Sequence, residues 1–319
     1  MDRKEINAIL EEAIALGKEA IPNGEVASYI PELSKADKNH LGLSIYTKDG
    51  RRYNMGDTDV RFTIQSISKI ITLAVALEAC GPEEIFAKVD VEPSGEAFNS
   101  LIDLDTTSNK PKNPMINSGA LTVTSLLLNK TTFSEMRVFA RKLCQDPEMD
   151  LDKAVFNSER ANISRNRAIA YLLESKGIIE SDVEDTLDLY TKMCSLTVTA
   201  NSLANLGLTL ANDGIDLSTG TRLLKTETVH MIKTIMLTCG MYDSSGEFAV
   251  HVGVPTKSGV GGGLVSTVDK EMGIGIFSPS LDEKGNCIAG RPVLEHLSKE
   301  LKLHIFEWQS RIVDQVKPV

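Results

Sequence analysis

Apolar residues follow a helical period at the start of the chain and an alternating period soon after it. The first stretch is predicted to be an amphipathic helix whose apolar face is formed by Ile6, Ile9, Leu10, Ala13 and Ile14. Residues 41–46 alternate between apolar and small or polar side chains, which predicts a strand. Asp49-Gly50 is a hairpin turn signal, so residues 51–55 are predicted to form the returning strand.

The middle of the chain changes to helical patterns from about Ser66 onward. Residues 70–77 leave almost no polar face, so this helix is predicted to be buried, and Gly81-Pro82 ends it. Further helices are predicted over residues 117–128, 133–143, 160–174, 183–194 and 199–211. Residues 92–114 are polar and rich in Pro, Ser and Asn, and they are predicted to form a loop.

Strand patterns return near the end of the chain. We predict strands at residues 248–254, 263–268 and 272–277, followed by a last helix that contains Val293 and Leu297. Parallel α/β folds alternate strands and helices more regularly. The order therefore indicates an α/β fold with an antiparallel sheet built from both chain ends, flanked by helices, and an inserted all-helical domain. We place the discontinuous α/β domain at residues 1–62 and 226–319 and the helical domain at 63–225.

Composition narrows the classes of function. The chain has 319 residues, of which 42% are hydrophobic and 24% charged, with a net charge of -10. This is globular usage, and its sign disfavours nucleic acid and anionic membrane surfaces as partners. No apolar stretch approaches the ~20 residues of a membrane span, and the first residues do not resemble a signal peptide, so we expect a cytoplasmic protein. The five cysteines and five histidines are scattered, which disfavours a disulfide framework and a metal site.

One motif, at the start of the helical patterns, contains residues that could act in catalysis. Ser66 and Lys69 form Ser-x-x-Lys at a predicted helix start, and residues three apart on a helix lie on one face. A lysine with a lowered pKa can take the proton of a serine and activate it as a nucleophile. Such a pair is expected about once by chance in a chain of this composition, so the motif alone does not define a site.

A second motif follows the strand predicted at residues 248–254. Lys257-Ser258-Gly259 resembles the Lys-Thr-Gly element that accompanies Ser-x-x-Lys in serine β-lactamases and penicillin-binding proteins. Glycines at 261–263 would let backbone approach a ligand closely, although a plain hairpin turn would also fit this segment. Ser164-Arg165-Asn166 matches the middle Ser-x-Asn element only loosely, and we give Ser164 no role.

Longer blocks of the sequence resemble the serine-dependent glutaminases, which occur in bacteria and as the catalytic domain of animal enzymes. The matching blocks, in family order, are residues 26–33, 56–58, 62–69, 92–95, 113–120, 158–160, 165–166, 187–194, 239–243 and 257–263. The resemblance implies a β-lactamase/transpeptidase-like fold with the active site between the two domains. It also implies hydrolysis of L-glutamine to L-glutamate and ammonia without a metal or organic cofactor. Family members are commonly dimers or tetramers.

The resemblance also implies roles for particular residues. Ser66 is the expected nucleophile, Lys69 the general base, and Tyr242 the phenol that relays a proton to the leaving ammonia. The backbone N–H groups of Ser66 and Val260 are expected to form the oxyanion hole. The positions that match substrate-binding residues are Tyr29, Ser66, Asn117, Glu159, Asn166, Tyr190, Tyr242 and Val260.

The chemistry of free glutamine agrees with these residue types. Glu159 can pair with the α-ammonium, and the amides and phenols can donate hydrogen bonds to the α-carboxylate. Such a site is expected to reject peptides, glutamine without its α-amino group, and asparagine, whose amide would lie away from Ser66. Two alternatives stay open: a hydrolase of the same fold acting on β-lactams, D-alanyl peptides or esters, and a non-enzymatic sensor that is acylated only once.

Overall fold

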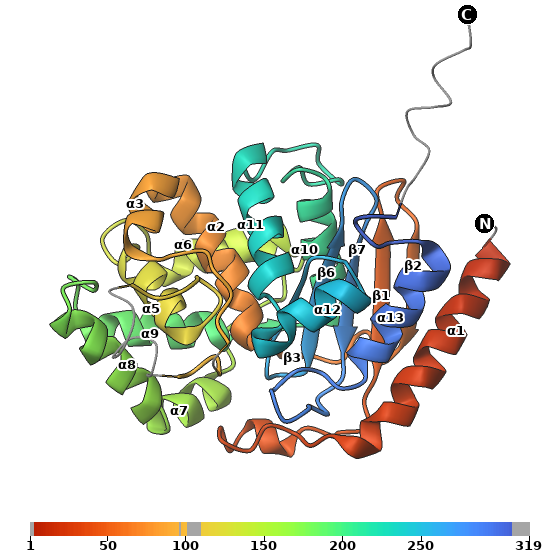
Figure 1. Cartoon of the computed structure of the whole chain (residues 1–319), viewed down its shortest axis with the longest axis horizontal. Coiled ribbons are helices and arrows are strands. Elements are labelled where there is room, and N and C mark those ends of the chain that lie inside the picture. Colours follow the sequence, from red (N-terminus) through yellow and green to blue (C-terminus); the bar gives the residue numbers. More distant parts are fainter. Residues whose placement is uncertain (1–2, 96, 101–109, 308–319) are drawn as a thin grey trace, which may run out of the picture.

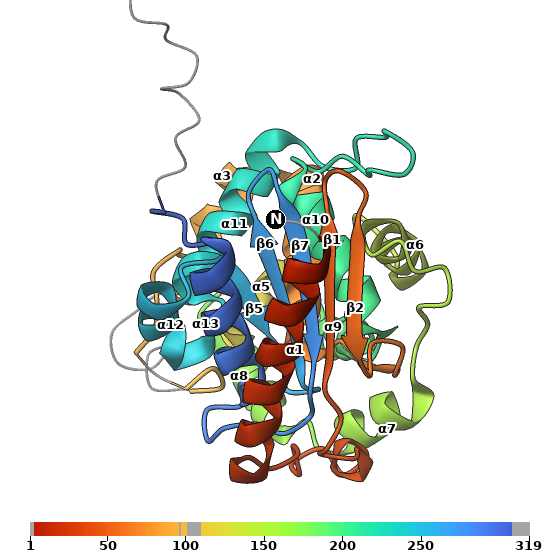
Figure 2. The same ribbon diagram turned by 90° about the vertical axis from the view of Figure 1, so that its right-hand side faces the viewer.

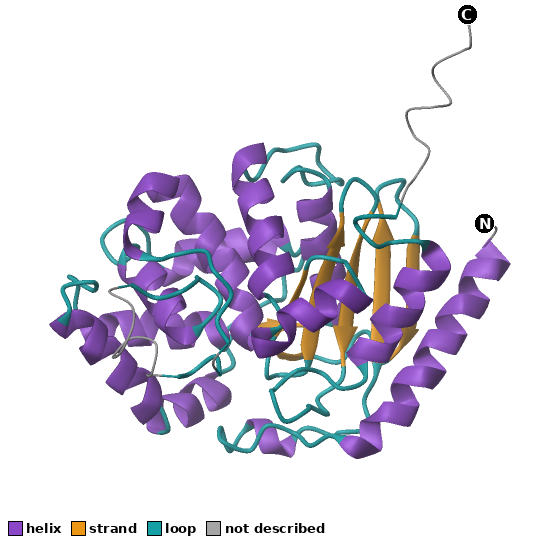
Figure 3. Ribbon diagram, viewed as in Figure 1, coloured by secondary structure: helices purple, strands orange, loops and turns teal. Residues whose placement is uncertain are grey.

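The computed structural model describes residues 3–95, 97–100 and 110–307. A twisted sheet lies on one side of the molecule and a group of helices on the other (Figures 1 and 3). The five strands are β1 (Gly42–Thr47), β2 (Arg52–Gly56), β5 (Thr256–Ser258), β6 (Gly263–Val268) and β7 (Met272–Phe277). Their order is β2-β1-β7-β6-β5, and all pairs are antiparallel.

The two ends of the chain meet between β1 and β7. Leu43 lies opposite Ile276 and Ile45 opposite Ile274 in this ladder, and all four side chains are buried. The prediction of an antiparallel sheet built from both chain ends is confirmed.

Each face of the sheet is covered by helices. Helices α1 (Arg3–Ala20) and α13 (Gly290–Leu301) pack on the outer face (Figure 2). Leu10, Ala13, Val293 and Leu297 form part of the apolar cluster there, because they lie on the inner faces of these two helices. On the other face, α10 (Ala200–Ala211) packs directly on β6 and β7.

The remaining helices surround α2 (Ser68–Cys80), in which every residue from Ser68 to Leu77 except Val75 is buried. They are α3 (Pro82–Lys88), α5 (Asn117–Ser125), α6 (Phe133–Leu143), α7 (Lys153–Ala161), α8 (Ser164–Ser175), α9 (Val183–Cys194) and α11 (Thr226–Cys239). Helix α12 (Ser245–His251) is the exception, because its Phe248 and Val252 belong to the apolar cluster of α1 and α13. A short antiparallel ribbon of β3 (Phe62–Thr63) and β4 (Thr197–Val198) lies beside them. None of the described helices is both long and apolar enough to cross a bilayer.

Two sequence predictions were wrong. The strand predicted at 248–254 is helix α12, because Phe248 and Val252, four residues apart, are buried while Val250 between them is 73% exposed. The third late strand is instead β5, which contains Lys257 and Ser258. The helix predicted over 160–174 is wrong only at its start: residues 164–174 lie in α8, whereas residues 160–161 end the separate helix α7.

Three further outcomes concern helix α11, the segment 92–114 and the division into domains. Helix α11 was not predicted, although its buried face, which includes Val229, Ile232 and Met236, has helical spacing. The described residues between 92 and 114 contain no helix or strand, in agreement with the predicted loop, and residues 96 and 101–109 lie outside the described residues. The division into domains at 63–225 stays a prediction, and α10, which falls in that range, packs on the sheet.

The contact between α10 and β7 yields a test of packing. A Cβ atom on Gly275 would lie 2.0 Å from the Ala200 carbonyl oxygen and 2.6 Å from the Ala204 nitrogen. Gly275→Ala should therefore lower the free energy of unfolding by about 2 kcal/mol or more, measured by urea denaturation. Gly246→Ala is the control, because Gly246 lies exposed in α12 with open space around it, and alanine there should be neutral or stabilising. Equal stabilities for the two variants would contradict this account of the contact.

Candidate active site

Ser66 lies where β3 turns into the buried helix α2. A short 3-10 helix, η3 (Gln65–Ile67), precedes α2, and Gln65 adopts a positive φ of 48°. Cβ atoms on Gly259 and Gly261 would meet the carbonyl oxygens of Ile64 and Thr63 at 2.8 and 2.3 Å. Only glycine allows this approach, which brings the 259–261 backbone, and with it Val260, against the segment that carries Ser66.

Lys69 is buried one helical turn after Ser66. Its side chain is 2% exposed, and Nζ donates to the Met115 carbonyl oxygen at 3.2 Å and to Asn117 Oδ1 at 2.7 Å. Burial lowers the pKa of the Lys69 amine to about 8, because the charged form loses its hydration. With this pKa, about a tenth of Lys69 is neutral at pH 7 and about half at pH 8, and this fraction can accept a proton.

Asn117 connects Lys69 to two other predicted residues. It begins α5, and its Nδ2 donates to Asn166 Oδ1 at 2.8 Å. The Tyr190 hydroxyl, from α9, donates to Asn117 Oδ1 at 3.4 Å. Asn113 holds the turn before this helix, since its Oδ1 accepts from the Met115 and Ile116 N–H groups at 2.9 and 3.2 Å. Four residues from four helices are thus brought into one polar network.

Glu159 contributes a buried carboxyl group from α7. The residue is 7% exposed, and Oε2 has no hydrogen-bond partner among the described residues. Burial raises the pKa of this carboxyl to about 7, although the Gln65 side chain and the Lys69 ammonium act in the opposite direction. An uncompensated carboxylate in this position is suited to a cationic ligand group.

Tyr29 approaches the same region from the loop that follows α1. More than half of the residue surface is exposed, yet burial of the phenol oxygen is the largest cause that raises its pKa. Tyr242 and Glu159 are the next causes, which places the phenol oxygen near both groups. The ring is therefore at the surface while its polar end faces the buried residues.

Tyr242 lies in η4 (Tyr242–Ser244), with a positive φ of 52°. Its ring is 4.7 Å from the Phe98 ring, centroid to centroid, and 4.4 Å from Lys257 Nζ. Burial raises the pKa of the phenol, and the Ser66 side chain is close enough to oppose that rise. The hydroxyl nevertheless has no partner with hydrogen-bond geometry among the described residues.

Sequence reasoning assigned no role to Lys257 and passed over Gln65. Lys257 is fully buried in β5, and its Nζ donates to the carbonyl oxygens of Gly240 at 3.1 Å and Ser258 at 2.6 Å. Burial lowers its pKa well below the usual value, and the charge of Lys69 lowers it further. The Lys-Ser-Gly motif could have pointed to Lys257, whereas the only sequence signal for Gln65 was its position next to Ser66.

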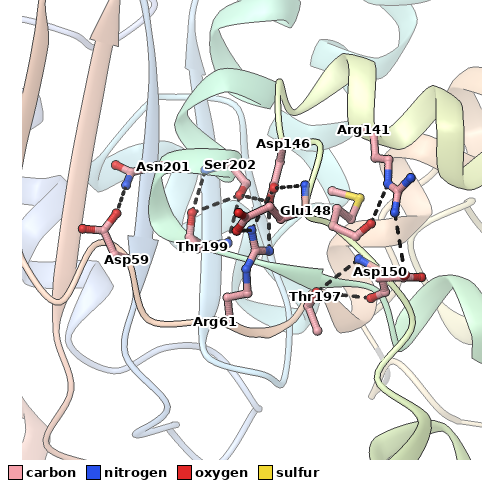
Figure 4. A network of polar contacts seen from close by, with 11 residues as sticks. Asp59, Arg61, Arg141, Asp146, Glu148, Asp150, Thr197, Thr199, Asn201 and Ser202 are labelled. Atoms are coloured by element: carbon pink, nitrogen blue, oxygen red, sulfur yellow. Dashed lines mark hydrogen bonds and ion pairs between the residues drawn. The ribbon is translucent and has the colours of Figure 1, made fainter.

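The strand that leads to Ser66 is anchored by an ion pair between exposed Arg61 and buried Asp146 (Figure 4). Arg61 makes two hydrogen bonds to Asp146, at 2.8 and 3.1 Å, and Asp146 also accepts one from Ser202 Oγ at 2.6 Å. Ser202 belongs to the first turn of α10, where it forms a reciprocal cap with Thr199. β3 is thereby tied to the helix that packs on the sheet.

This architecture belongs to the β-lactamase-like class: an antiparallel sheet from both chain ends, a helical region, and a buried serine and lysine where the two meet. The family model of glutaminase matches residues 24–306, and the chain belongs to the glutaminase family. Among the described residues, no group of three or more His, Cys, Asp or Glu side chains is placed to hold a metal ion.

Relatives named glutaminase cover nearly the whole chain. A glutaminase of Clostridium botulinum (strain Loch Maree / Type A3) is 48% identical over 94% of this chain and 100% of its own. Glutaminase 2 of Clostridium perfringens (strain 13 / Type A) is 50% identical over 93% and 99%.

Solved structures agree in fold. The probable glutaminase ybaS superposes with a TM-score of 0.91 at 36% identity, covering 97% of this chain and 100% of its own. A probable glutaminase from Bacillus subtilis, in complex with 6-diazo-5-oxo-L-norleucine, has a TM-score of 0.86 at 35% identity, covering 96% and 98%.

The raised pKa of Glu159 makes stability depend on pH. Between the usual value of 4.5 and about 7 the folded state holds a proton that the unfolded state has released, so stability falls as pH rises. Glu159→Gln should remove a loss of about 3 kcal/mol between pH 5 and 8, measured by urea unfolding at several pH values. Glu184→Gln is the control, because Arg167 lowers the pKa of the partly buried Glu184 and keeps it ionised throughout this range. Parallel pH curves for wild type and Glu159→Gln would contradict the assignment.

Proposed function

We propose that this chain hydrolyses the side-chain amide of L-glutamine to L-glutamate and ammonia through an acyl-enzyme on Ser66. The observation that carries the proposal is the Lys69 amine, buried one turn after Ser66 with a lowered pKa, in a chain of the glutaminase family. A neutral amine next to a serine hydroxyl is the arrangement that makes a serine nucleophilic.

The reaction proceeds in two half-reactions. Neutral Lys69 takes the proton from Ser66 Oγ as that oxygen attacks the amide carbon, and the N–H groups of Ser66 and Val260 stabilise the oxyanion. The tetrahedral intermediate collapses to an ester when the amide nitrogen leaves as ammonia with a proton relayed by Tyr242. Water, deprotonated by the same lysine, then attacks the ester and releases glutamate, and the proton returns to Ser66.

Recognition of the amino-acid end rests on the network around Asn117. Glu159 pairs with the α-ammonium, which agrees with the free Oε2 of this buried carboxyl. Asn117, Asn166, Tyr29 and Tyr190 bind the α-carboxylate through their amide and phenol donors. The ligand in the Bacillus subtilis structure supports this substrate class, since 6-diazo-5-oxo-L-norleucine keeps the α-amino and α-carboxyl groups of glutamine.

The proposal also includes the position of the active site, the absence of a cofactor, the compartment and the oligomeric state. The active site lies between an α/β domain (1–62 and 226–319) and a helical domain (63–225), and no metal or organic cofactor takes part. The protein acts in the cytoplasm as a homo-oligomer. Five free cysteines and the acidic composition support a reducing compartment without a polyanionic partner.

Ammonia release from L-glutamine tests the reaction and the nucleophile together. Ser66→Ala should lower kcat by at least about a thousandfold, because no other group forms the acyl-enzyme. Ser298→Ala is the matched control: it also removes a buried serine hydroxyl, one that donates to the Val252 carbonyl oxygen at 2.6 Å outside the site. Turnover that survives in Ser66→Ala, or its absence from the wild type, would overturn the proposal.

The rate should also depend on pH in a defined direction. As pH falls, Lys69 takes up a proton near pH 8 and is lost as a base, and Glu159 takes up one near pH 7 and no longer pairs with the ammonium. We expect kcat/KM to decrease below about pH 8, and more steeply below about pH 7. Glu159→Gln should remove the steeper part at a lower overall kcat/KM. A flat profile from pH 6 to 9 would exclude Lys69 as the base.

A further inference from the structure

The backbone at Tyr242 is in a conformation that the residue itself does not favour. Its φ of 52° lies in the left-handed region, where the Cβ of an L-amino acid is crowded. Such a conformation persists only when surrounding contacts hold it. The contacts that hold this backbone are important, because the backbone determines where the phenol points.

The side chain of Tyr242 is held by packing and not by a hydrogen bond. Its ring is buried against Val260, Leu281 and Phe98, and it lies 4.4 Å from Lys257 Nζ. The hydroxyl has no partner with hydrogen-bond geometry among the described residues. Packing keeps the ring in this cluster, and the backbone at residues 241 and 242 determines the direction from which the side chain enters it.

Ser245 holds that backbone from both sides of the strained residue. Its Oγ accepts a hydrogen bond from the Met241 N–H at 3.0 Å and donates one to the Tyr242 carbonyl oxygen at 2.8 Å. The same carbonyl accepts from the Ser245 N–H, and the residue is 4% exposed. One buried hydroxyl thus joins the 240–241 peptide group to the 242–243 peptide group, across Met241 and Tyr242.

Apart from the Ser245 hydroxyl, the main contacts of this turn are made by Gly240. Gly240, which precedes the pair, is held against β5, since its carbonyl oxygen accepts from the Ser258 N–H and from Lys257 Nζ, each at 3.1 Å. Asn286 adds only a long contact, 3.4 Å from its Nδ2 to the Met241 carbonyl oxygen. Without the Ser245 hydroxyl, this turn keeps the backbone hydrogen bonds from the Ser244 N–H to the Met241 carbonyl oxygen, at 3.0 Å, and from the Ser245 N–H to the Tyr242 carbonyl oxygen. It loses the side-chain link across the strained residue, so Tyr242 can shift while Gly240 stays in place.

We propose that Ser245 is a positioning residue for the reaction, whose hydroxyl holds Tyr242 in the left-handed conformation that aims its phenol at Ser66. This inference rests on the proton-relay role proposed above for Tyr242. Ser245 contacts no reacting atom, so its loss acts through the placement of Tyr242. A displacement of about 1 Å in a proton-transfer group can lower a rate about a hundredfold.

The test measures kcat and KM for L-glutamine in a double-mutant cycle of Ser245→Ala and Tyr242→Phe. We expect Ser245→Ala to lower kcat about ten- to a hundredfold while KM changes less than about threefold. In the Tyr242→Phe background, Ser245→Ala should change kcat less than about twofold, because the phenol it positions is already absent. Ser298→Ala controls for the loss of a buried serine hydroxyl and should retain the wild-type kcat. If Ser245→Ala does not fold, Ser245→Cys replaces it in the cycle, since a thiol makes the same two hydrogen bonds more weakly.

The outcomes separate this inference from the function it rests on. If Tyr242→Phe lowers kcat but Ser245→Ala leaves it within about twofold of the wild type, Ser245 has no positioning role. The same conclusion follows if the two losses multiply in the double variant, because the effect of Ser245 would then be independent of the phenol. If Tyr242→Phe itself retains full kcat, the relay role fails and the positioning role fails with it, while the Ser66 reaction is judged separately by Ser66→Ala.

Discussion

The burial of the Lys69 amine is the constraint on which the rest of the site depends. An ammonium group inside an apolar helix bundle is costly unless acceptors surround it, and the same burial lowers its pKa into the range useful for a base. The acceptors are the Met115 carbonyl oxygen and Asn117 Oδ1. The start of α5 must therefore lie against the start of α2, and the turn held by Asn113 makes this possible.

A second set of contacts brings the sheet to the same place. The glycines at 259 and 261 let β5 and the segment after it approach the backbone that leads into Ser66. Lys257, on this strand, underlies the ring of Tyr242, and the Gly240 carbonyl that accepts from Lys257 precedes the turn in which Tyr242 lies. The site is thus assembled from a helix start, a strand and a turn that are far apart in the sequence.

Two of these parts contain backbone in the left-handed region at residues other than glycine. Gln65 adopts it immediately before Ser66, and Tyr242 adopts it at the residue that carries the phenol. Local strain of this kind is kept only where surrounding structure determines it. Around Ser66 the ion pair of Arg61 and Asp146 and the packing against Gly259 and Gly261 hold the chain, and around Tyr242 the Ser245 hydroxyl does so.

The sequence by itself determined most elements and indicated candidate residues for the site. Period and turn signals identified β1, β2, β6 and β7 and the buried helix α2, because each of these has one dominant pattern of burial. The family blocks pointed to Ser66, Lys69 and the residues around Asn117. The alternating pattern of residues 248–254 led to a wrong prediction of a strand. Val250 faces solvent although it is apolar, so alternation in the sequence did not match alternation in burial. Only the packing of Phe248 and Val252 on the core decides between helix and strand. Tertiary structure alone decided the pKa values of Lys69 and Glu159, the burial of Lys257 beneath Tyr242, and the clamp made by Ser245, since each arises from groups that the fold brings together and no local pattern encodes.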